Sequence, residues 1–221
     1  MLIKFVFLLY SLLTFSILAD SVILNNRDNF KNITPKTKIL KKSERNIDII
    51  RKPEVEINFK KINSTSLNLG IIQGEFWLKY EIKNNSNNPD WIFEFDHPHI
   101  EKIEFYEFNK NNLINNLSTG NKFPLSSKII PSKNFLFPVI IPKGKERTYY
   151  IFIKARTSLI INLYIWQKNK YITQVSKENF LYGIYLGIMM VMALYNLFLF
   201  LSIKESTYLY YILYILCFTT M

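Results

Sequence analysis

The sequence predicts a mainly β protein, in which an exported antiparallel β-sandwich or jelly roll is followed by transmembrane α-helices. Three observations support this fold class. Short segments in the middle of the chain alternate apolar and polar residues, as half-buried strands do. Turns rich in Asn, Pro and Gly separate these segments. Finally, residues 179–203 contain no charged residue, and a helix of that length, ~37 Å, can cross the hydrocarbon core of a bilayer.

Residues 1–21 have the pattern of a signal peptide. Lys4 precedes an uncharged apolar stretch from Phe5 to Leu18, and residues 19–21 supply the small-any-small pattern of a cleavage site. As a helix, the apolar stretch would extend only ~21 Å, which is short of the ~30 Å hydrocarbon core. We therefore predict an export signal, with an uncleaved membrane anchor as the alternative.

The basic segment at residues 22–52 follows the signal peptide. It is polar, and its Lys and Arg residues outnumber its acidic residues. Charge runs of this kind are usually solvated, so we predict a loose lead-in to the sandwich. The alternative is a basic arm that contacts anionic lipid or polymer.

The sandwich itself is predicted to occupy residues 53–172. Its clearest strand covers residues 76–83, where every second residue from Phe76 is apolar and the others, starting with Trp77, should face water. The polar segment 109–116 is predicted to be a loop. Further strands are predicted at residues 55–59, 91–95, 103–108, 135–141, 149–153 and 159–165.

Two membrane segments follow the sandwich. Residues 180–203 are predicted to form the first transmembrane helix, and residues 207–221 the start of a second one, with a short polar turn between them. A pair of buried helices in a soluble domain is the alternative. If the sandwich is exported, the turn at Lys204 faces the cytoplasm, in agreement with the positive-inside rule.

Three residues of the first membrane segment are candidates for helix packing. Gly183 and Gly187 lie four residues apart on one helix face and allow another backbone to approach closely. The amide of Asn196 would need a partner helix or a polar cavity within the hydrocarbon. We therefore expect a bundle with partner helices or a second copy of the chain.

The sequence offers little for catalysis or metal binding. Cys217, the single cysteine, lies in an apolar run, and neither a G-x-S-x-G motif nor a glycine-rich phosphate loop occurs. His97 and His99 could share a strand face and hold a metal, but Asp96 and Pro98 make a turn the stronger interpretation. We predict a protein that is not an enzyme and needs neither metal nor cofactor. A hydrolase with paired carboxylates is the remaining enzyme alternative.

Aromatic residues are the better candidates for ligand binding. Trp77 and Tyr106 fall on the strand faces opposite the main apolar rows. On the surface of a jelly roll, such rings stack on sugars or other flat ligands. Because aromatic residues make up 16% of the chain, a position in a protein core is the stronger interpretation of both residues.

The net charge of +11 does not by itself indicate a nucleic-acid partner. Residues with A/T-rich codons, such as Ile, Lys, Asn, Phe and Tyr, dominate the chain, so base composition of the gene accounts for much of the lysine excess. We therefore expect no nucleic-acid binding.

Several short motifs occur in a specific order around the membrane boundary. The helical motifs are Tyr182-Gly183 with Gly187, then Ala193-Leu194-Tyr195-Asn196-Leu197-Phe198-Leu199-Phe200, and then Tyr208-Leu209-Tyr210-Tyr211. The exported motifs are Gly74-Glu75-Phe76-Trp77-Leu78-Lys79-Tyr80, Asn84, Pro98-His99-Ile100-Glu101-Lys102-Ile103-Glu104-Phe105-Tyr106, Thr119-Gly120-Asn121, Phe123-Pro124, Phe137-Pro138 and Ile141-Pro142-Lys143-Gly144. Over roughly residues 50–221, this order resembles the bacterial seven-transmembrane receptors with diverse intracellular signalling modules, including their type 2 extracellular domain.

The resemblance implies a non-catalytic sensor in the bacterial inner membrane, with its sandwich on the periplasmic or extracellular side. A small-molecule or carbohydrate ligand would bind the sandwich, and a helix bundle would pass the change to a cytoplasmic output domain. Since the sequence ends within its second membrane segment, we expect an input portion truncated before the remaining helices and the output domain. The alternative function is a membrane-anchored module that binds carbohydrate or another envelope component and does not signal.

Overall fold

The computed structural model describes residues 21–42, 44–71, 74–156 and 158–219. The chain divides into two compact units, residues 1–170 and residues 171–221, which are described separately below. Apart from Ser21, the predicted signal peptide lies outside the described residues.

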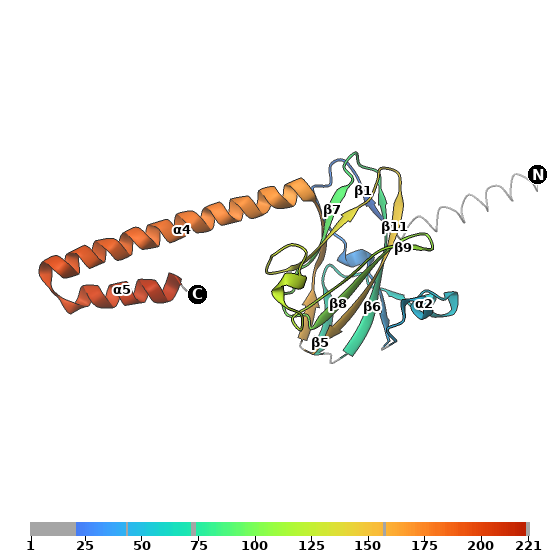
Figure 1. Cartoon of the computed structure of the whole chain (residues 1–221), viewed down its shortest axis with the longest axis horizontal. Helices are drawn as coiled ribbons and strands as arrows, with labels where there is room; N and C mark the ends of the chain where they lie inside the picture. Colours follow the sequence, from blue (N-terminus) through green and yellow to red (C-terminus); the bar gives the residue numbers. More distant parts are fainter. Residues whose placement is uncertain (1–20, 43, 72–73, 157, 220–221) are drawn as a thin grey trace, which may run out of the picture. The chain divides into compact units, whose positions relative to one another are not determined.

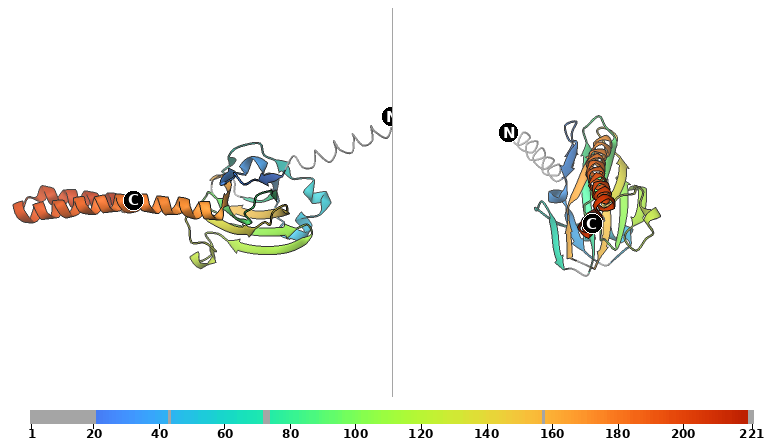
Figure 2. Two further views of the ribbon diagram at one scale, coloured as in Figure 1. Left: turned by 90° about the horizontal axis from the view of Figure 1, so that it is seen from above. Right: turned by 90° about the vertical axis from the view of Figure 1, so that its left-hand side faces the viewer.

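The first unit is a β-sandwich built on two main sheets (Figures 1 and 2). The larger sheet has seven strands in the order β4-β3-β6-β11-β8-β9, and β1 also pairs with β6. All its pairings are antiparallel except that of β1 with β6. Its strands are β1 (Val22–Leu24), β3 (Lys38–Lys41), β4 (Lys60–Lys61), β6 (Gly74–Asn84), β8 (Lys102–Asn109), β9 (Asn112–Thr119) and β11 (Glu146–Ala155).

The smaller sheet is antiparallel throughout, with the strand order β10-β7-β13-β2. Its strands are β2 (Phe30–Asn32), β7 (Asp90–Phe95), β10 (Phe135–Ile140) and β13 (Leu163–Gln167). A separate two-stranded ribbon joins β5 (Leu67–Ile71) to β12 (Ser158–Ile161), and two 3-10 turns, η1 (Thr34–Lys36) and η2 (Leu125–Ser127), lie in connections. The predicted antiparallel β-sandwich is confirmed.

The main core lies between the two sheets. In β6, Phe76, Leu78 and Tyr80 point inward because alternate residues of a strand face the same side. Side chains of both sheets meet in this layer. The rings of Phe105 in β8 and Phe137 in β10 stack with centroids 4.6 Å apart. The fold is therefore held together by aromatic packing across the sandwich, as the apolar strand pattern predicts.

The prediction of a loose lead-in at residues 22–52 is wrong. The segment contributes β1, β2 and β3 to the two sheets, and it also contains the short helix α2 (Ile47–Ile50). Val22, Leu24 and Ile33 are buried in the main core. Composition was misleading here because strands of three or four residues need only one or two inward apolar side chains, and the lysines between them face outward.

Three strand and loop predictions also need correction. The segment 55–59 is no strand: helix α3 (Pro53–Glu56) begins at Pro53, whose fixed φ suits a first helical turn, and Ile57 is 83% exposed. The predicted loop 109–116 instead forms a tight turn at Lys110, with φ 54°, and then β9. The predicted strand 159–165 is divided between β12 and β13.

The second unit consists of two helices, α4 (Lys168–Ile203) and α5 (Ser206–Thr219); the first residues of α4 belong to the first unit. The chain reverses direction between the helices at Lys204, whose φ is 59°. Helix α4 contains a stretch with mean hydropathy 2.2 that is long and apolar enough to cross a membrane. None of that stretch is buried, which distinguishes α4 from the core helix of a soluble protein. Helix α4 includes the predicted first span, residues 180–203, but begins earlier, at Lys168.

Candidate functional site

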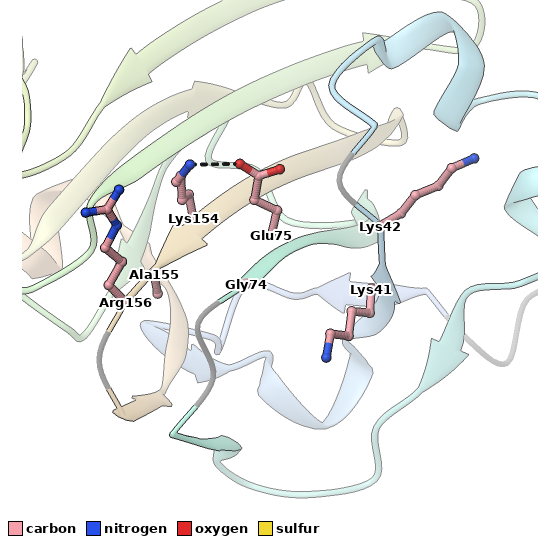
Figure 3. Close-up of a pocket in the computed structure, with 7 residues that line it drawn as sticks. All are labelled: Lys41, Lys42, Gly74, Glu75, Lys154, Ala155 and Arg156. Atoms are coloured by element: carbon pink, nitrogen blue, oxygen red, sulfur yellow. Dashed lines mark hydrogen bonds and ion pairs between the residues drawn. The ribbon is translucent and has the colours of Figure 1, made fainter.

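An open pocket of about 630 Å³ lies at one end of the larger sheet, where β3 and β11 end and β6 begins (Figure 3). Strand register explains why these distant segments meet. Lys154 in β11 is the cross-strand partner of Glu75 in β6, and Lys41 in β3 is the partner of Phe76, one residue further along β6. The described residues that line the pocket are Lys41, Lys42, Gly74, Glu75, Lys154, Ala155 and Arg156.

Glu75 is the single carboxylate among these lining residues. Its Oε1 accepts hydrogen bonds from Lys154 Nζ at 3.0 Å and from Arg45 Nη2 at 2.7 Å. The hydrogen bond from Arg45, together with that from Lys154, outweighs the effect of burial and holds the pKa of Glu75 below its ordinary value. The carboxylate therefore stays ionised at neutral pH and fixes the two cations beside it.

Arg156 is held at the pocket by a second carboxylate. Its Nε lies 2.8 Å from Glu101 Oε2, and Lys122 Nζ lies 2.6 Å from Glu101 Oε1. The hydrogen bond from Lys122 outweighs desolvation and lowers the pKa of Glu101. The Arg156 side chain is still 65% exposed, so the other donors of its guanidinium remain available to a ligand.

The chemistry of the lining is suited to binding a polar or charged ligand. Its described side chains provide ammonium and guanidinium donors and one carboxylate, but no Ser, Cys or His that could act as nucleophile or proton shuttle. A site of this composition can hold a polar ligand through charge-assisted hydrogen bonds.

The predicted ligand-binding rings, Trp77 and Tyr106, lie on the outer face of the larger sheet, the same face as Glu75. They are not exposed. Trp77 is fully buried and donates from Nε1 to the carbonyl of Glu44 at 2.8 Å, and Tyr106 is only 9% exposed. The candidate aromatic surface therefore does not face water, and the core position that the sequence favoured describes both residues.

A cover formed by residues 44–59 explains this burial. It carries α2 and α3 across the outer face and forms a second hydrophobic cluster on the sheet. The members of this cluster are Ile50, Trp77, Tyr106, Phe108, Tyr150 and Phe152, with Leu40, Ile47, Val55 and Phe59 packed against them.

Polar contacts fasten the cover to the sheet. The guanidinium of Arg51 lies over the Phe108 ring, 3.9 Å from its centroid. At the other end, Glu56 Oε1 accepts hydrogen bonds from Tyr150 Oη at 2.6 Å and from Lys79 Nζ at 2.5 Å. Burial favours the neutral acid, but these contacts outweigh it and lower the pKa of Glu56.

The two histidines lie in a turn after β7. Their ring centroids are 6.1 Å apart, and the His97 amide donates to the carbonyl of Phe95 at 2.9 Å. Burial lowers the pKa of His97, so the imidazole is neutral at pH 7. In the described part of the chain, no three His, Cys, Asp or Glu side chains lie close enough together to hold a metal ion.

Neither candidate glycine of α4 lies against another helix in the described part of the chain. A Cβ added at Gly183 or Gly187 would meet no atom within 4 Å, and the Asn196 amide donates to the Met192 carbonyl of the same helix at 2.8 Å. A role of these residues in helix association stays a prediction.

Comparison with protein families identifies the sandwich. The family described as 7TMR-DISM extracellular 2 matches residues 36–167, more than half of the chain. The chain belongs to this family. The membrane part of 7TMR-DISM proteins, described as 7TM diverse intracellular signalling, matches residues 178–221. The resemblance read from the sequence is confirmed, and the two matches together describe a membrane protein with an extracellular N-terminal domain.

Several solved structures resemble this 7TMR-DISM chain distantly. A beta-glucosidase from Kluyveromyces marxianus in complex with glucose is 13% identical with a TM-score of 0.37, over 59% of this chain but only 15% of the enzyme. TmCBM61 in complex with beta-1,4-galactotriose is 10% identical with a TM-score of 0.30, over 62% of this chain and 86% of that one. A structure of carbohydrate-binding modules of the β-sandwich superfamily is 9% identical with a TM-score of 0.29, over 65% of this chain and 59% of that one. Comparison with curated proteins gives no significant match.

Proposed function

We propose that this chain is the ligand-sensing input portion of a membrane receptor for signal transduction and that it is not itself an enzyme. The observation that carries the proposal is the order of the two family matches, an extracellular domain followed by a match to the 7TM diverse intracellular signalling family. The pocket at the ends of β3, β6 and β11 supports it, because its lining suits a non-covalently bound ligand.

The proposal includes a location and partners. The sandwich lies on the periplasmic or outer side of a bacterial inner membrane, and α4 crosses that membrane. The ligand is a small molecule or a carbohydrate. Further helices of the receptor, or those of a second copy, pack against α4.

Binding to the intact protein is the first test. The full chain, reconstituted in lipid nanodiscs, is screened for its melting temperature against neutral sugars, sugar acids, sugar phosphates, amino acids and cell-wall fragments. We expect at least one class to raise the melting temperature, since a ligand that binds only the folded state stabilises it. If no compound raises it, direct ligand sensing is wrong.

Signalling requires more than binding, because the ligand must favour one of two global states. Hydrogen exchange is therefore measured along α4 with and without a stabilising ligand. A change in α4 protection supports a receptor. Unchanged protection at saturating ligand supports the alternative, a membrane-anchored binding module without signalling.

A further inference from the structure

We propose that the pocket at the ends of β3, β6 and β11 binds a small anion that also carries hydroxyl groups, such as a sugar acid or a sugar phosphate. This inference rests on the proposed sensing function and names the class of ligand. Four cationic side chains line the pocket against one carboxylate, Glu75.

Two of the cations have no counter-charge among the described residues. The side chains of Lys41 and Lys42 make no hydrogen bond or ion pair with another residue in the described part of the chain. They leave the backbone on opposite sides of β3, so that one reaches each side of the sheet edge (Figure 3). Lys154 and Arg156 are each paired on one side only, with Glu75 and Glu101. A negatively charged group beside Glu75, on the outer face of the sheet, is therefore attracted by Lys42, Lys154 and Arg156.

Glu75 selects for hydroxyl groups beside the charge. Its contacts to Arg45 and Lys154 are both made by Oε1, and the other oxygen turns away from Lys154 in Figure 3. An ionised carboxylate can only accept hydrogen bonds, so it binds a ligand hydroxyl well and repels a second anionic group. The combination of cations with one fixed acceptor matches a hydroxylated anion better than an anion without hydroxyl groups.

The size of the pocket agrees with this class of ligand. Small-molecule sites in proteins usually enclose roughly 300–1,000 Å³, and the pocket has about 630 Å³. It is open to solvent, so a sugar acid at the end of a longer chain could also enter.

Calorimetric titration of the full chain in nanodiscs of neutral lipid tests the proposal. The probes are glucuronate, glucose 6-phosphate, glucose and inorganic phosphate. We expect glucuronate or glucose 6-phosphate to bind at least about tenfold more tightly than glucose, and their binding to weaken as salt is added. The stronger of the two distinguishes a carboxylate from a phosphate as the recognised group.

Matched charge variants locate the site. Lys42→Gln with Lys154→Gln removes two positive charges from the pocket, and Lys133→Gln with Lys145→Gln removes two from exposed positions elsewhere in the sandwich. We expect the first pair to lower the affinity for the anionic sugar by about tenfold or more, and the second by less than about twofold. Melting temperatures of both pairs without ligand show whether each still folds.

Glu75→Gln tests the selectivity argument separately. Without the carboxylate, inorganic phosphate should bind more tightly, and the preference for the hydroxylated anion over phosphate should fall by several-fold.

Three results would overturn the inference. The first is equal loss of affinity in the pocket pair and the control pair. The second is glucose binding as tightly as the anionic sugars. The third is no binding of either anionic sugar; if neutral ligands still stabilise the chain in the melting screen, the sensing function stands while this inference falls.

Discussion

The indole of Trp77 connects the larger sheet to the cover, and its replacement should be costly. Trp77→Ala removes a fully buried ring and the hydrogen bond to Glu44. We expect the free energy of unfolding to fall by about 3–5 kcal/mol, as measured by urea denaturation. The control Ile140→Ala, at a side chain that is 65% exposed, should change it by less than about 0.5 kcal/mol. A small effect at Trp77 would mean that the cover is not part of the stable fold.

Glu56 makes the stability of the cover depend on pH. The folded pKa lies below the ordinary 4.5 because hydrogen bonds from Lys79 and Tyr150 outweigh burial. Its contribution is therefore fully present above about pH 4.5 and is lost as the pH falls through the folded pKa. We expect Glu56→Gln to destabilise the protein at pH 7 and the difference from wild type to shrink at acid pH.

Urea denaturation between about pH 3 and pH 7 measures that difference. Glu54→Gln, in the same helix and with an exposed carboxylate, is the control and should follow the wild-type profile. If the difference in free energy of unfolding between Glu56→Gln and the wild type stays constant with pH, the role given to the Glu56 carboxylate is contradicted.

The sequence could predict which side chains share a strand face, but not what covers that face. Trp77 and Tyr106 do lie opposite the main core, yet the apolar residues of the cover, such as Ile50 and Phe59, bury them. The pocket residues went unnoticed because Lys42, Glu75 and Lys154 are far apart in the chain. Strand register alone brings them together, and register depends on long-range pairing that periodicity does not reveal.

At the scale of elements, Gly120 fixes the connection that follows β9. Its φ is 145°, and a Cβ there would lie 2.7 Å from the Lys102 Cα of the neighbouring strand β8. Backbone atoms cannot move aside as a flexible side chain can, so we expect Gly120→Ala to lower the free energy of unfolding by about 2 kcal/mol or more. Thermal and urea unfolding measure this change.

Gly144→Ala is the matched control for this effect. Gly144 also has a positive φ, 73°, but no atom lies within 4 Å of a Cβ built there. Gly144→Ala should therefore lower the free energy of unfolding by only about 1 kcal/mol, because only the backbone conformation is unfavourable for alanine. Equal effects at the two glycines would show that the close approach to β8 is unimportant.

Strands with long, regular alternation were predictable, and short edge elements were not. β6, β7 and β8 supply the aromatic core, and their apolar residues recur at every second position. In contrast, β2 and β4 have two or three residues, too few for a periodic signal. The Asn-rich strand β9 contains residues typical of turns and becomes a strand because it pairs along β8.

Helix α4 carries the prediction about association in the membrane. If Gly183 and Gly187 form a close contact with another helix, replacing both with Leu should weaken association by about 1 kcal/mol or more, because backbones can no longer approach. Fluorescence energy transfer between labelled chains in nanodiscs measures self-association. The conservative pair Ile184→Leu and Ile188→Leu, on a different part of the helix surface, should have little effect. Unchanged association in the glycine variant would exclude this face as a contact between copies.

For the whole molecule, the central expectation is that the sandwich and the turn between α4 and α5 lie on opposite sides of one membrane. Cys217 is the single cysteine, so a Cys217→Ser background permits labelling at chosen sites. Lys145→Cys lies in an exposed turn of the sandwich, and Glu205→Cys lies between the two helices.

In spheroplasts of a Gram-negative host that produces the full chain, a membrane-impermeant maleimide should label the cysteine at position 145 without permeabilisation. The cysteine at position 205 should react only after detergent opens the membrane, because α4 has placed it on the cytoplasmic side. Labelling at both positions in intact spheroplasts would show that α4 does not span. Protection of both would show that the sandwich is not exported. Only the asymmetric result leaves the sandwich facing an outside ligand while α4 reaches the cytoplasm, which is the arrangement that a sensor requires.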